Sequence, residues 1–228
     1  MNLQERVLRV QEEITATALR VGRDPATIKL VVVTKKQSIQ DIKTLFDLGI
    51  RDFGESRIQE AEEKQCSLPP EISWHMIGHL QSNKVSKAVG AYSLIHSVDS
   101  LELARKISQK SQERGLITDI LLEVNTSGEE AKHGLTVDAI RDQFSHFIAL
   151  PALRIRGLMT MAAMMATGTF EEQERVRASF RLLATLKREL QGSLQDFTEL
   201  SMGMSQDFPL AIEEGATLLR VGSRIFGL

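Results

Sequence analysis

Eight short apolar segments alternate with stretches of helical periodicity, and this alternation constrains the fold of the chain more than any other feature. The first segment, residues 29–34, contains four consecutive apolar and mostly β-branched residues, 30–33, which is typical of a parallel strand covered on both faces by helices. The other expected strands are 51–53, 73–77, 93–97, 118–124, 153–159, 198–200 and 217–221. The expected helices between them are 38–48, 58–64, one beginning near 82, 101–114, 137–150, 170–190 and 208–214.

Crossover connections between successive strands predict one parallel sheet, and eight strands are the number that closes a (β/α)8 TIM barrel. An open doubly wound sheet is the alternative, but no Gly-x-Gly-x-x-Gly follows the first strand. Helical spacing before that strand predicts one extra N-terminal helix over about 2–21, with Gly22 as its stop. We therefore expect a single α/β domain that covers residues 1–228.

Composition excludes several classes of function. A net charge of −2 gives no electrostatic reason to expect nucleic acid or an anionic membrane as a partner. No stretch approaches the roughly 18 apolar residues of a spanning helix, and the first residues have no signal region, so we expect a cytoplasmic protein. Cys66 is the only cysteine, and His75 and His79 fall on a strand and the loop after it. These spacings predict no disulfide and no metal site.

Two lysines, Lys35 and Lys36, follow the first strand. A lysine at the mouth of a buried strand is partly desolvated, and desolvation frees its amine as a nucleophile, as in Schiff-base lysines. The alternative is a solvated pair that opens a loop. Side-chain alternation allows only one of the two to face a central cavity, and the residues themselves do not decide which.

The loops after the last two strands have the composition of a phosphate site. In (β/α)8 barrels the active site lies at the carboxyl ends of the strands, and phosphate is held by the loops after strands seven and eight. These loops are 201–205, with the sequence Ser-Met-Gly-Met-Ser, and Gly222-Ser223. Small residues let backbone amides approach an anion, and serines donate hydroxyls. The same residues are also common in ordinary turns.

Arg220 lies inside the eighth expected strand. A buried arginine must find an acceptor, because it cannot lose its proton. The acceptor is either a carboxylate inside the barrel, such as Glu55, Asp99 or Glu123, or a ring nitrogen or anion of a ligand. Strands one and eight are neighbours in a closed barrel, so a reactive amine, a phosphate loop and a cation converge there. This combination suggests pyridoxal 5′-phosphate (PLP) as the cofactor.

Longer stretches across the whole chain carry a family pattern. They are Val33-Thr34-Lys35, 53–60, 74–84, 95–99, Val124-Asn125, Gly128-Glu129-Glu130 with Lys132, 157–161, 200–208 and 220–227. By these motifs the chain resembles the pyridoxal phosphate homeostasis proteins, the YggS/PROSC family, which are single-domain relatives of the alanine racemase N-terminal barrel. The resemblance implies the fold-type III arrangement of PLP-binding proteins.

The resemblance also assigns roles to residues. It implies that Lys35, which follows a Val-Thr step, forms the Schiff base, and that Arg220 faces the ring nitrogen. Phosphate ligands map to Ser201, Gly222 and Ser223. We also place Ser56, Met159, His79, Met202 and Gly203 in the cofactor site. Two positions depart from the family pattern: Ser56 stands where asparagine is usual, and Lys36 stands next to Lys35 in place of the usual Lys-Thr-Lys-Pro segment.

An arginine at the pyridine nitrogen disfavours its protonation, which weakens the ring as an electron sink. Racemases take a second acid/base tyrosine from another domain, whereas the only tyrosine here, Tyr92, precedes the fourth strand on the side away from the site. The resemblance thus implies a monomeric PLP-binding protein of intracellular PLP homeostasis, not an enzyme. It would buffer PLP, hand it to PLP-dependent apoenzymes and influence the amino-acid and keto-acid balance. The alternatives are a minor PLP-dependent racemase-type enzyme of amino acids and a sugar-phosphate barrel enzyme with a Schiff-base lysine.

Overall fold

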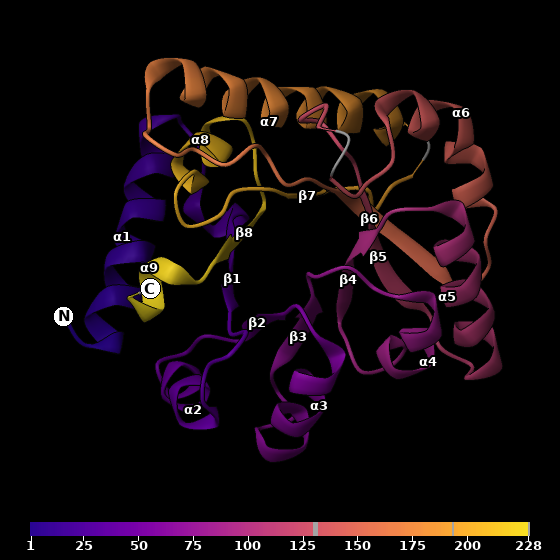
Figure 1. Cartoon of the computed structure of the whole chain (residues 1–228), viewed down its shortest axis with the longest axis horizontal. Helices are drawn as coiled ribbons and strands as arrows, with labels where there is room; N and C mark the ends of the chain where they lie inside the picture. Colours follow the sequence, from indigo (N-terminus) through magenta and orange to yellow (C-terminus); the bar gives the residue numbers. More distant parts are fainter. Residues whose placement is uncertain (130–131, 193, 228) are drawn as a thin grey trace.

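The computed structural model describes residues 1–129, 132–192 and 194–227; Glu130, one of the motif residues above, lies outside them. Parallel strands pair in sequence order, and β8 returns to β1, so the sheet is a closed barrel (Figure 1). The prediction of a single (β/α)8 barrel is confirmed. The strands are β1 (Lys29–Val33), β2 (Asp52–Glu55), β3 (Ser73–Met76), β4 (Leu94–Val98), β5 (Thr118–Glu123), β6 (Leu153–Met159), β7 (Glu199–Ser201) and β8 (Leu218–Val221).

Helices surround the strands, and the longest of them, α7, runs along one whole side of the molecule (Figure 1). The helices are α1 (Leu3–Arg20), α2 (Ile39–Asp47), α3 (Ile58–Ser67), α4 (Val85–Ala88), α5 (Leu101–Glu113), α6 (Val137–Ile148), α7 (Phe170–Gln191), α8 (Phe208–Glu213) and α9 (Ser223–Phe226). Short 3-10 turns occur at Pro25–Thr27 and Ser82–Lys84. No helix in the described ranges is both long enough and apolar enough to cross a bilayer.

Local sequence explains where the long helices begin. Ser38, Ser100, Thr136 and Thr169 each precede a helix, and the hydroxyl of each accepts a hydrogen bond from the backbone N–H three residues further on. Such caps satisfy one of the free N–H groups of the first turn. The turn chemistry and the apolar periodicity therefore select the same helices.

The extra N-terminal helix, α1, packs against α9 at the C-terminal end of the chain. In α1 the apolar side chains Val7, Val10 and Ile14 are buried, and Arg6 Nε donates to the carbonyl of Ile225 in α9 at 2.7 Å. The two termini consequently lie on the same side of the barrel (Figure 1). This helix is the one predicted over about 2–21.

The apolar core has two layers. A large cluster fills the space between the sheet and the helices, and a smaller one fills the inside of the barrel. The inner cluster consists of Val31, Leu94, Leu121, Met159 and Leu218. Because side chains alternate along a strand, neighbours of these residues such as Val32 pack in the outer layer. The barrel is therefore closed by packed side chains below its carboxyl-terminal mouth.

Most expected strand ends differ from the observed ones by one or two residues, and two of these shifts affect residues of the site. The second strand continues past Phe53 to Glu55, because Gly54 has no side chain where Val31 and Ile77 approach; an added Cβ would lie 3.1 Å from each of them. The seventh strand continues to Ser201, which pairs with Met159 of β6. Ser201 thus belongs to the barrel wall and not to the loop that the sequence predicts.

Candidate functional site

A cavity of about 680 Å³ opens at the carboxyl ends of β1, β2, β6, β7 and β8. This volume falls within the range of about 300–1,000 Å³ that is usual for small-molecule sites. Its wall includes Val33, Lys35, Lys36, Ser56, Arg57, Glu60, Ile77, Met161, Met164, Met165, Met204, Ser205, Gln206, Asp207, Arg220, Gly222 and Ser223. The cavity therefore lies at the end of the barrel where the fold places active sites.

Both lysines after β1 line this cavity. Alternation along β1 places Val31 inside the barrel, and Lys35 continues the series of Val31 and Val33 toward the cavity. The expectation that Lys36 must then face away is wrong. Lys36 has φ +61°, so the chain leaves the extended conformation there, and Lys36 also lines the cavity. This left-handed conformation is uncommon for a residue with a side chain.

A buried ion pair supports the peptide immediately before Lys35. Lys64 Nζ donates to Glu55 Oε1 at 2.6 Å and to the carbonyl oxygen of Thr34 at 2.8 Å. The Thr34 hydroxyl donates to the same carboxylate oxygen at 2.7 Å. Glu55 is fully buried and Lys64 is nearly so. These bonds hold the end of β1 against β2 and α3, so they position the backbone from which Lys35 projects.

Arg220 is a buried cation on the cavity wall. Its Nη1 donates to Ser201 Oγ at 2.5 Å, and its Nη2 donates to the carbonyl of Thr160 at 2.8 Å. Two of the carboxylates considered as partners are engaged elsewhere, since Glu55 pairs with Lys64 and Asp99 pairs with His79. Burial lowers the pKa of Arg220 to about 10, so the guanidinium stays charged at neutral pH. A buried cation of this kind is suited to a ligand acceptor or anion.

A chain of hydrogen bonds runs from Arg220 across the inside of the barrel. Ser201 Oγ lies 2.8 Å from His96 Nδ1, His96 Nε2 lies 2.9 Å from His75 Nδ1, and His75 Nε2 lies 3.0 Å from Asp52 Oδ1. Arg220 can only donate, so the buried Ser201 hydroxyl accepts a hydrogen bond from it and donates one to His96 Nδ1. His96 then donates to His75, and His75 donates to the Asp52 carboxylate.

Charge and burial agree with this direction of donation. Burial lowers the pKa of His96 well below its usual value, and the charges of His75 and Arg220 act in the same direction. Burial alone would raise the pKa of Asp52, but the hydrogen bond and charge of His75, together with Lys29, lower it overall. The chain thus has a neutral His96 in its middle and an ionised carboxylate at its end. It fixes the orientation of the Ser201 hydroxyl, and through it that of Arg220.

The loops after β7 and β8 meet at the cavity. Ser205 Oγ accepts from the backbone N–H of Gly222 at 3.2 Å and from that of Arg224 at 3.4 Å. A Cβ added at Gly222 would lie 3.1 Å from both Val33 Cβ and the Val33 carbonyl oxygen, so glycine is needed for this loop to pack against β1. Ser205, Gly222 and Ser223 therefore present small side chains and hydroxyls close to the exit of β1, as the phosphate hypothesis requires.

The structure brings some of the predicted cofactor residues to the cavity wall and places others elsewhere. Those on the wall are Lys35, Ser56, Arg220, Gly222 and Ser223. The others are absent from the wall of this cavity as described: Ser201 lies inside the barrel, Met159 belongs to the inner apolar layer, Met202 and Gly203 are buried behind the loop, and His79 pairs with Asp99. The Ser201 hydroxyl contacts Arg220, which lies on the wall, and its predicted contact with phosphate stays a prediction.

Sequence reasoning missed the methionines at the cavity mouth. Met161, Met164 and Met165 lie in the segment after β6, and Met164 is 83% exposed. Such flexible, polarisable side chains adapt to irregular ligand surfaces. Their clustering within five residues is visible in the sequence, but nothing in their spacing indicates that they face the cavity.

Glu123, at the end of β5, is a buried acid with a raised pKa. Burial and the charge of Asp99 raise its pKa to about 7, and the charges of Arg220 and His133 oppose that rise only in part. Groups that titrate near neutral pH inside a barrel mouth are functional candidates. The sequence suggested Glu123 only as one of several partners for Arg220.

The closed (β/α)8 barrel, with Lys35, Arg220, Gly222 and Ser223 at one cavity, is a barrel of the alanine racemase N-terminal type. Residues 19–228 match the family described as alanine racemase, N-terminal domain. The chain belongs to the pyridoxal phosphate homeostasis protein family. It is 38% identical, over an alignment of 229 residues, to the pyridoxal phosphate homeostasis protein of Aquifex aeolicus, with 100% of this chain and 98% of that relative covered.

Solved structures give the same result. A protein described as unknown from Bifidobacterium adolescentis superposes with a TM-score of 0.90 at 34% identity, covering 98% of this chain and 94% of that one. PipY of Synechococcus elongatus, solved with PLP bound, superposes with a TM-score of 0.84 at 36% identity. That match covers 99% of this chain and 100% of PipY. The whole barrel, and not a part of it, is shared with these relatives.

Proposed function

We propose that the cavity binds PLP and that the protein serves PLP homeostasis by holding the cofactor and delivering it. The observation that carries this proposal is the meeting of Lys35, Arg220 and the Gly222-Ser223 loop at one cavity. PipY, which was solved with PLP bound, has the same fold at 36% identity and supports the assignment. The Aquifex relative is named for PLP homeostasis, which supports the role.

The donors in the cavity match the groups that PLP carries. Its phosphate needs N–H and hydroxyl donors, and the hydroxyls of Ser205 and Ser223 line the cavity beside Gly222, whose N–H donates to Ser205 Oγ. Its aldehyde needs a primary amine, and its pyridine nitrogen needs a donor. We assign the amine to Lys35, which would form a Schiff base with loss of water, and the donor to Arg220. Bound PLP supplies an electrophilic carbon and an electron-accepting ring.

Arg220 favours holding the cofactor over catalysis with it. A guanidinium that is fixed by Ser201 and Thr160 can only donate to the pyridine nitrogen. Protonation of that nitrogen would place a second positive charge against the first, so the ring stays a weak electron sink. Carbanion chemistry therefore receives little support from this site.

No tyrosine, the second acid/base group of the racemases, lies on the described cavity wall. Tyr92, the only tyrosine, packs in the apolar layer between sheet and helices, before β4 begins. Burial raises its pKa, and the charges of Glu55 and Glu62 add to that effect. We infer a monomeric carrier that buffers PLP in the cytoplasm, passes it to PLP-dependent apoenzymes and does not turn over amino acids.

Titration of the cofactor-free protein with PLP tests the proposal. Wild type should develop the visible absorbance of a protonated Schiff base, and Lys35→Ala should lose it. Lys36→Ala is the matched control, because Lys36 lines the same cavity and should leave the band in place. A band that survives in Lys35→Ala and disappears in Lys36→Ala would contradict the assignment.

Two further measurements distinguish carrier from enzyme. The PLP-loaded wild type should reactivate a PLP-dependent apoenzyme. The Lys35→Ala variant, which can hold PLP only non-covalently, should exhaust its residual PLP sooner and restore less activity. A panel of D- and L-amino acids in deuterium oxide should show no α-proton exchange above background. Exchange at a catalytic rate would favour the racemase-type alternative.

A further inference from the structure

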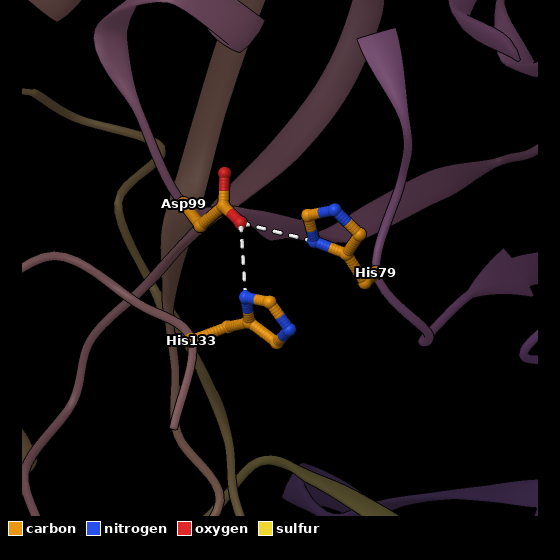
Figure 2. A group of neighbouring side chains, drawn as sticks. All are labelled: His79, Asp99 and His133. Atoms are coloured by element: carbon orange, nitrogen blue, oxygen red, sulfur yellow. Dashed lines mark ion pairs between the residues drawn. The ribbon is translucent and has the colours of Figure 1, made fainter. Parts of the chain in front are cut away.

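A second group of chemically active side chains lies across the barrel mouth. It consists of His79 in the loop after β3, Asp99 directly after β4, and His133 in the loop after β5 (Figure 2). His79 Nδ1 lies 3.1 Å from Asp99 Oδ2, and His133 Nδ1 lies 4.0 Å from the same oxygen. The ligand atoms of all three residues lie within 4.8 Å of one another. None of the three belongs to the described wall of the lysine cavity.

We propose that His79, Asp99 and His133 form a binding site for a divalent transition-metal ion of the Zn²⁺ type. Two imidazole nitrogens and one carboxylate oxygen are a ligand set that Zn²⁺ uses in proteins, with bonds of about 2.0–2.2 Å. Such bonds place neighbouring ligand atoms roughly 3.3 Å apart in a tetrahedral site. The present distances to Asp99 Oδ2, 3.1 Å from His79 Nδ1 and 4.0 Å from His133 Nδ1, lie on either side of that value, and both histidines are exposed enough to move the remaining distance.

The two rings are stacked in this structure, so at least one of them must rotate before both Nδ1 lone pairs, which lie in the ring planes, can point at one ion. His79 and His133 stack, with ring centroids 4.4 Å apart and an angle of 16° between the planes. Figure 2 shows that both Nδ1 atoms face the same carboxylate oxygen. Two protonated imidazoles stacked this closely would repel each other. Neutral imidazole is the form that binds metals, so binding of one ion by both rings requires both to be neutral.

The backbone on either side of the ligands is held in place. Ser97 Oγ donates to the carbonyl of Gly78, which ties the residue before His79 to the strand that carries Asp99. The residue after His133, Gly134, has φ +116°, and a Cβ there would lie 2.7 Å from Asn125 N. Paired hydrogen bonds between 123–125 and Leu135 close that loop. The three side chains therefore project from anchored backbone, as ligands of a built site do.

Three protein ligands leave one position of a tetrahedral ion for water or another small ligand. His75 is not part of the group, since it bonds to His96 and Asp52 inside the barrel. The four-residue spacing of His75 and His79 was therefore uninformative about metal binding. The partners of His79 come from the ends of two later strands.

The test uses the full-length chain after treatment with a chelator. Calorimetric titration with Zn²⁺ alone should show one equivalent bound, and titration with Co²⁺ should give the visible bands of a nitrogen- and oxygen-liganded ion. His79→Gln and His133→Gln should each weaken Zn²⁺ binding by about tenfold or more, since even loss of an outer partner of a metal site costs that much. His146→Gln, on the exposed surface of α6, is the matched control and should bind normally.

Three results would overturn the proposal. The first is Zn²⁺ affinity that is unchanged in both His79→Gln and His133→Gln, with folding verified by circular dichroism. The second is a thiolate-to-cobalt charge-transfer band, which would assign the ion to the exposed Cys66. The third is no binding by the wild type. Lys35→Ala should keep the metal site intact, so failure here and failure of the PLP proposal are separable.

Discussion

Replacement of Lys64 by methionine probes the structure that supports the lysine cavity. The ammonium group of Lys64 is held by Glu55 at 2.6 Å and by the Thr34 carbonyl at 2.8 Å, in a region from which water is excluded. Methionine keeps most of the side-chain volume and removes the charge and the donors. Glu55 would then remain as a buried carboxylate with the Thr34 hydroxyl as its donor, because Oε2 has no hydrogen-bond partner among the described atoms.

The expected cost follows from this geometry. Removal of one partner from a buried ion pair typically costs about 3–5 kcal/mol, because the other charge stays desolvated. The loss should fall at the upper part of that range, since Glu55 is fully buried and its second oxygen is already unpaired. The double variant Glu55→Gln/Lys64→Met removes both charges and should recover about half or more of the loss, because replacing a whole buried pair is often close to neutral.

Urea unfolding of the two single variants and the double variant at neutral pH measures these free energies. We also expect weaker PLP binding by Lys64→Met, since the Thr34 carbonyl before Lys35 loses its hydrogen bond from Lys64. Lys87→Met is a suitable control, because its pair with Glu62 is exposed and such pairs are worth about 0–1 kcal/mol. The reasoning would be refuted if Lys64→Met lost less than about 1 kcal/mol of unfolding free energy, or if the double variant were no more stable than Lys64→Met.

Two other perturbations test the barrel interior. Ser201→Ala removes an acceptor from Arg220 and a donor from His96, so unfolding in urea should cost about 1–3 kcal/mol less free energy than in wild type and the PLP dissociation constant should rise. Burial raises the pKa of Glu123 to about 7, so the folded protein binds this proton more tightly than the unfolded chain does. The folded protein therefore loses stability as the pH rises toward and through 7. In chelator-treated protein, Glu123→Gln should therefore gain about 2–3 kcal/mol relative to wild type between about pH 5 and about pH 8. An unchanged difference across that range would contradict the assignment.

The fold could be predicted because its determinants are local. Each strand is marked by its own apolar run, and helix starts are marked by capping residues such as Ser100 and Thr136. The eight-fold alternation then leaves few topologies to choose from. The convergence of Lys35 and Arg220 followed as well, since closure of the barrel makes β1 and β8 neighbours.

The parts that could not be predicted depend on side chains from strands far apart in the sequence. Lys64 has the appearance of an ordinary charge near the end of a helix, yet it is buried against Glu55. A one-residue shift of a strand end moves Ser201 from the predicted loop to the barrel wall. There its hydroxyl contacts Arg220 and His96, and the sequence does not indicate these partners. His133 meets Asp99 only through the closure of the loop after β5. No periodicity in a single sequence carries that information.

Borohydride reduction of the PLP-loaded wild-type protein tests the central claim most directly. Reduction converts a Schiff base into a stable secondary amine, so proteolysis and mass measurement of the peptides locate the attached residue. The account predicts a single pyridoxyl group on Lys35, with Lys36 and Lys64 unmodified. Attachment at Lys36, or no covalent attachment in a protein that has bound PLP, would contradict it.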